Sequence, residues 1–93
     1  MEDIKEKLAE YILVLEKSSH DNHRAEHRVK YKDHLATAAL MYIALKKHKS
    51  LERLKDIVQT ERRSYGWDEP LDGEPGEAAE RAFGEFANYV ESK

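Results

Sequence analysis

The most chemically distinctive feature of this sequence is a group of histidines in its first third. Four of the five histidines lie at positions 20, 23, 27 and 34. On a helix, which turns 100° per residue, these four side chains fall within about 60° of one another. Imidazole binds metal ions and changes charge near neutral pH. The spacing therefore indicates a metal site, a pH-responsive surface, or a half-exposed helix face that packs against a neighbouring helix or subunit.

A metal site would use His23 and His27, because side chains four residues apart on a helix can share one ion. The other candidate ligands are His20 and Glu26. Two observations weigh against this site. The chain contains neither an H-E-x-x-H motif nor the Glu-x-x-His pairs of di-iron bundles, and Lys30 would place a repelling ammonium on the same side. We therefore expect a packed face without a cofactor, and keep a His/carboxylate metal site as the alternative.

The net charge of −3 is distributed unevenly along the chain. Residues 20–63 contain eleven Lys and Arg against six Asp and Glu, whereas residues 64–93 contain two basic and eight acidic residues. A basic region such as 24–63 could serve a nucleic-acid accessory factor, which needs a concentrated positive field. The pI of about 5.9 argues against that function, so nucleic acid is an unlikely partner. We expect the opposite charges to attract each other within the fold or between subunits.

The composition limits the function classes further. The chain of 93 residues is long enough for one small domain and contains no cysteine, which excludes disulfides, thiolate metal sites and cysteine nucleophiles. It begins with an acidic amphipathic segment instead of a signal peptide, and it has no apolar run long enough to span a membrane. We expect a cytoplasmic protein. Without a G-x-S-x-G or a phosphate-binding glycine loop, we expect no enzymatic activity.

The hydrophobic periodicity predicts an all-α fold, a small bundle of about four helices. We expect helices over residues 3–17, 22–48, 50–65 and 76–92, with a turn-rich connector at 66–76 that contains both prolines. Ser50 is a suitable N-cap for the third helix. The inward face of the last helix is predicted to consist of small and aromatic residues: Ala79, Ala82, Phe83, Phe86, Ala87 and Val90.

The long second helix is apolar on nearly all sides, which favours a central position in a bundle or in a dimer. One side carries Ala25, Val29, Ala36, Ala39, Leu40 and Ile43, and the roughly opposite side carries Tyr31, Leu35, Ala38, Tyr42 and Leu45. We therefore expect a non-enzymatic protein that acts through protein–protein contact, as a homodimer. The predicted interface residues are Leu35, Ala38, Ala39, Met41, Tyr42, Leu45 and the loop aromatic Trp67.

Overall fold

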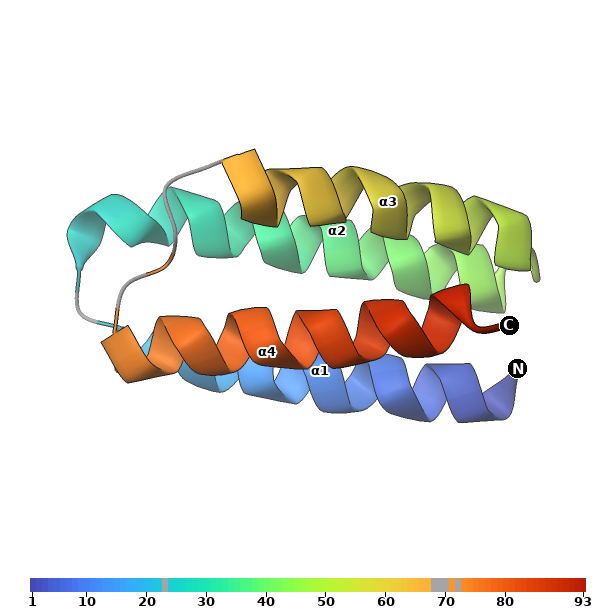
Figure 1. Cartoon of the computed structure of the whole chain (residues 1–93), viewed down its shortest axis with the longest axis horizontal. Helices are drawn as coiled ribbons and strands as arrows, with labels where there is room; N and C mark the ends of the chain where they lie inside the picture. The colour runs from blue at the N-terminus through green and yellow to red at the C-terminus, as the bar shows by residue number, and fades with distance from the viewer. Residues whose placement is uncertain (23, 68–70, 72) are drawn as a thin grey trace.

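The protein is an antiparallel bundle of four helices in up-down-up-down order (Figure 1). The computed structural model describes residues 1–22, 24–67, 71 and 73–93, and of Trp67 only the main chain. The helices are α1 (Glu2–Asp21), α2 (Arg28–Lys46), α3 (Leu51–Trp67) and α4 (Gly73–Glu91), with a short 3₁₀ helix η1 (Ala25–His27) before α2. This confirms the predicted all-α fold. None of the described helices combines the length and apolar character that a membrane crossing requires.

The helices form a ring in which each contacts its two neighbours. Helix α1 packs most extensively against α4 and also against α2, while α3 contacts α2 and α4. Figure 1 shows α1 and α4 side by side in one layer and α2 and α3 in the other, with both chain ends at the same end of the bundle. Helices α2 and α4 are therefore diagonally opposite. Each turns one side toward the shared core and another toward solvent.

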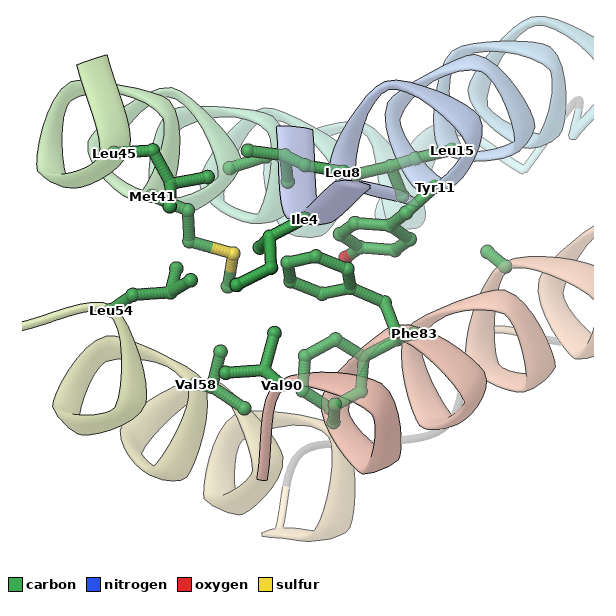
Figure 2. Packing of buried hydrophobic residues seen from close by; sticks show 14 of the residues in the cluster. Ile4, Leu8, Tyr11, Leu15, Met41, Leu45, Leu54, Val58, Phe83 and Val90 are labelled. Atoms are coloured by element: carbon green, nitrogen blue, oxygen red, sulfur yellow. The ribbon is translucent and has the colours of Figure 1, made fainter. Parts of the chain in front are cut away.

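Side chains from all four helices meet in one hydrophobic core (Figure 2). Helix α1 buries apolar residues at helical spacing, and Leu8 and Leu15 are fully buried. Met41 and Leu45 extend from α2 toward this layer. The opposite wall of the core consists of apolar side chains from α3 and α4: Leu54, Val58, Phe83, Phe86, Ala87 and Val90. The predicted inward face of the last helix is confirmed, with Ala82 half-buried at its edge.

The connection between the first two helices differs from the prediction. The first helix was predicted to end at residue 17, but α1 continues to Asp21, and α2 begins at Arg28 instead of residue 22. The reason is a long-range contact: the buried Ser18 hydroxyl donates a hydrogen bond of 2.5 Å to the carbonyl of Pro75. This bond satisfies the hydroxyl inside the helix, so it does not compete with the helical main chain.

The later helix ends also extend beyond the predicted limits. Helix α3 includes Gly66 and ends at Trp67, and α4 begins at Gly73, so the predicted connector at 66–76 is partly helical; residues 68–70 and 72 lie outside the described part. The α2–α3 turn agrees with the prediction, because the Ser50 hydroxyl accepts a hydrogen bond of 3.1 Å from the Arg53 amide.

Gly76 has a packing role in the first turn of α4. It is buried, and a methyl group added at its Cα would collide with the main-chain carbonyl of Leu71. Leu71 itself is buried against the core. Only a glycine therefore lets the segment before α4 cross this close to the helix.

Candidate functional site

His34 takes part in a buried polar contact between α2 and α3. Its Nδ1 atom lies 3.1 Å from Oε2 of Glu61, and both residues are buried. An ionised carboxylate only accepts hydrogen bonds, so Nδ1 donates the proton. The imidazole also stacks on the ring of Tyr65, with ring centroids 4.0 Å apart. The pair connects two helices in the interior, where a charge is stable only if it has a partner.

An aromatic stack extends this contact across the bundle to α1 and α4. The Tyr65 ring stacks on Phe83 at 4.5 Å, and its hydroxyl shares a hydrogen bond of 2.6 Å with the hydroxyl of Tyr11. Burial raises the pKa of both tyrosine hydroxyls, and the nearby Glu61 carboxylate raises the pKa of each further. Both hydroxyls therefore stay protonated in the folded protein at neutral pH.

His27 belongs to a second polar cluster, at the end of the bundle where α1 meets α2. Its Nδ1 atom shares a hydrogen bond of 3.2 Å with the side-chain amide of Asn22, which also donates to the Tyr31 hydroxyl at 3.1 Å. The Tyr31 hydroxyl lies 2.6 Å from the hydroxyl of Ser18. Among the described residues, every buried side-chain N or O atom has a hydrogen-bond partner. These contacts fasten the α1–α2 connection to the core.

The structure does not bring together His20, His27 and Glu26, the candidate metal ligands that it describes. His20 is exposed at the end of α1, and His27 is buried with its Nδ1 atom bonded to Asn22. Glu26 is exposed and forms an ion pair of 3.2 Å with Arg24, and His23 lies outside the described part. Within that part, no three His, Asp or Glu side chains are placed to hold a metal ion.

Residues 23–27 read H-x-x-E-H, the order found on the zinc-binding helix of one class of metalloenzymes. That chemistry requires a regular helix that presents the imidazoles together. Here Ala25–His27 is a 3₁₀ turn, and His27 lies in the interior. Of the grouped histidines that the structure describes, His27 and His34 are buried and His20 is exposed.

The predicted interface residues fall into two groups. Ala38, Met41 and Leu45 are buried in the core of the single chain, and Leu35 packs half-buried at its edge. These side chains are already covered within one molecule. Ala39 and Tyr42 are exposed, and the side chain of Trp67 lies outside the described residues.

The exposed apolar surface of α2 lies on the side away from the core. Val29, Leu40 and Ile43 are 66%, 55% and 42% exposed, and all three project from the same side of the helix. The small residues Ala36 and Ala39 of α2, and Ala25 of η1 before it, are also exposed on this side. We call this surface the outward face of α2. Its members were grouped on one side of the helix by periodicity, but only Ala39 among them was predicted as an interface residue.

Basic side chains lie along one edge of this face and directly after its C-terminal end. Arg28, Lys32 and Lys46 are exposed on α2 and Lys47 is exposed directly after it, and none of these four forms an ion pair within the described part of the chain. Asp33 is the one acidic residue of α2. By contrast, Arg62 on α3 forms a two-pronged ion pair with Glu91 at 3.1 Å. The expected attraction between the basic middle and the acidic end is therefore present at Arg62, whereas Arg28, Lys32 and Lys46 form no such pair with the described residues.

A groove between α2 and α3 continues the outward face. Leu40 forms part of it from α2, and Ile57 and Thr60 line it from α3. Asp56 and the edge of the buried Glu61 also border it. The face and the groove together offer an apolar surface with polar margins.

Comparison of the chain with protein-family models, with curated proteins and with solved structures found no match.

Proposed function

We propose that this protein acts without catalysis, as a protein-binding module whose binding surface is the outward face of α2. The observation that carries the proposal is the exposure of Val29, Leu40 and Ile43 on a helix whose opposite side already fills the core. Large apolar side chains gathered on one exposed helix face are typical of a protein–protein contact. Folding of the single chain does not require them.

The polar groups of the interior support a structural role over a catalytic one. Inside the bundle the His34 imidazole is hydrogen-bonded to the Glu61 carboxylate, and the Tyr11 hydroxyl is hydrogen-bonded to the Tyr65 hydroxyl. These bonds connect the helices, and Glu61 contributes only an edge to the groove between α2 and α3. The absence of cysteine fits a reducing compartment, so we propose the cytoplasm as the location.

The experiment compares two leucines that are both exposed but lie on different helices. Leu40→Lys alters the outward face, whereas Leu13→Lys alters α1, where Leu13 is 66% exposed. Neither change should alter the free energy of unfolding by more than about 0.5 kcal/mol, because both sites are on the surface. Photo-crosslinking from position 43 to a bound protein should disappear with Leu40→Lys and persist with Leu13→Lys. Crosslinking that responds equally to both variants would contradict the proposal.

The predicted homodimer is one form that this contact can take. Light scattering of the full chain at high micromolar concentration measures it directly. A dimer that Leu40→Lys dissociates would assign the outward face to a second copy, and a monomer would leave the face for a different protein.

A further inference from the structure

We infer that the outward face of α2 binds an acidic amphipathic helix of another protein and not a second copy of this chain. The inference rests on the proposed function and specifies its partner. It is based on an apolar strip that lies beside basic residues on α2. Asp33 is the one acidic residue of that helix.

The charges on this face oppose pairing of two α2 helices. In a two-fold dimer the same patch occurs on both subunits. An antiparallel arrangement would place Arg28 and Lys32 of each subunit near Lys46 and Lys47 of the other, and a parallel one would stack equal charges. Like charges placed together in an interface are unfavourable in either arrangement.

Head-to-tail pairing of α2 with α4 of a second copy would match the charges but would lack an apolar contact. Helix α4 carries exposed acidic residues, including Glu77, Glu80 and Glu85. Its apolar side chains face inward, and the described part of α4 has no large apolar side chain on its surface. It could match the charge of the outward face but not its apolar strip.

An acidic amphipathic helix meets both requirements. Apolar residues on one side of it would pack on Val29, Leu40 and Ile43 and into the groove beside Ile57. Glutamates flanking that side would reach the basic residues at the margin. The ion pairs at such a margin are partly solvated, so they select the partner and the orientation, while the apolar contact supplies most of the affinity.

The test uses the full chain and three synthetic helical peptides of about 18 residues, long enough to cover α2 from Val29 to Ile43. All three are held helical by the same side-chain staple and carry leucines at helical spacing. The flanking positions are glutamate in the first, glutamine in the second and lysine in the third. Fluorescence anisotropy reports binding of each labelled peptide at low and at high salt.

We expect the glutamate peptide to bind about tenfold tighter than the glutamine peptide at low salt, and the lysine peptide not to bind. High salt should reduce the difference in affinity between the glutamate and glutamine peptides. The variant Lys32→Glu/Lys46→Glu should weaken binding of the glutamate peptide about tenfold or more, and Leu40→Lys/Ile43→Lys should abolish it. The matched controls Arg81→Glu on α4 and Leu13→Lys on α1 should leave it unchanged.

Three results would overturn the inference in distinguishable ways. A dimer that Leu40→Lys/Ile43→Lys dissociates would assign the face to a second copy, and the proposed function would stand. Equal binding of the glutamate and glutamine peptides would show that charge does not select the partner. A monomer that binds none of the three peptides, but binds a short DNA duplex at low salt regardless of Leu40→Lys, would overturn both the inference and the proposed function.

Discussion

At the scale of residues, the carboxylate of Glu61 is stable in the apolar interior because the His34 imidazole lies 3.1 Å away. Burying an ionised group without a partner is costly, whereas a well-paired group can be tolerated. The Tyr65 ring covers the imidazole, which keeps the pair away from water. Sequence periodicity placed His34 on a face with the other histidines, but it could not reveal Glu61, which comes from another helix 27 residues away.

This pairing predicts that the contributions of His34 and Glu61 to the free energy of unfolding are strongly coupled. His34→Leu should destabilise the protein by about 3–5 kcal/mol, because the Glu61 carboxylate is left buried and without its donor. The double variant His34→Leu/Glu61→Leu should recover a large part of that loss. Urea denaturation of the wild type, both single variants and the double variant measures the coupling. Additive effects of the two single changes would contradict the account.

The pair of buried tyrosines predicts instability in alkaline solution. Burial raises the pKa of Tyr11 and Tyr65 in the folded chain, while an unfolded tyrosine ionises near pH 10. Because the folded state retains protons that the unfolded state releases, stability should be complete below about pH 10 and fall as the pH rises beyond it. Urea midpoints measured between about pH 8 and 11 should show this decline.

The control for that measurement is the double variant Tyr11→Phe/Tyr65→Phe. It lacks both buried hydroxyls, and each removed hydroxyl is the partner of the other, so neither leaves an unpaired group. Its urea midpoint should depend less on alkaline pH than that of the wild type. The same alkaline decline in both proteins would show that other groups cause it.

At the scale of elements, the start of α4 depends on one glycine. Gly76→Ala would drive a methyl group into the main chain of Leu71, so we expect a loss of about 1–3 kcal/mol or more in stability. Gly84→Ala, at an open position in the same helix, should instead stabilise the protein by up to about 1 kcal/mol. Thermal unfolding of the two variants gives the comparison. A neutral Gly76→Ala would contradict the described packing of Leu71.

Local sequence patterns were sufficient to predict the number of helices and their approximate positions. The 3.6-residue spacing of apolar residues identified all four helices, and Ser50 was recognised as a cap. The predicted end of the first helix at residue 17 was wrong because Ser18 donates a hydrogen bond to Pro75, a residue 57 positions away. The second helix is apolar on two sides, so its periodicity alone could not show which side faces the core. For that reason Ala38, Met41 and Leu45 were assigned to an interface although they lie inside the bundle.

At the scale of the whole molecule, charge is arranged by position in the ring of helices. Helices α2 and α4 are diagonally opposite, and Arg28, Lys32 and Lys46 of α2 form no ion pair with the described acidic residues of α4. Cross-helix pairs form elsewhere. Arg62 binds Glu91, and Asp3 binds both Tyr89 and Lys93 where the chain ends meet. The molecule therefore presents one edge that is basic and apolar together.

The central claim is that this edge is a binding surface for an acidic helix. The most direct measurement is a titration of the isotopically labelled full chain with the glutamate-flanked peptide, followed by the amide chemical shifts in NMR spectra. The account predicts saturable shifts concentrated between Val29 and Lys47 and along the α3 side of the groove around Ile57. Saturable shifts confined to α1 or α4, or no shifts at all, would contradict it.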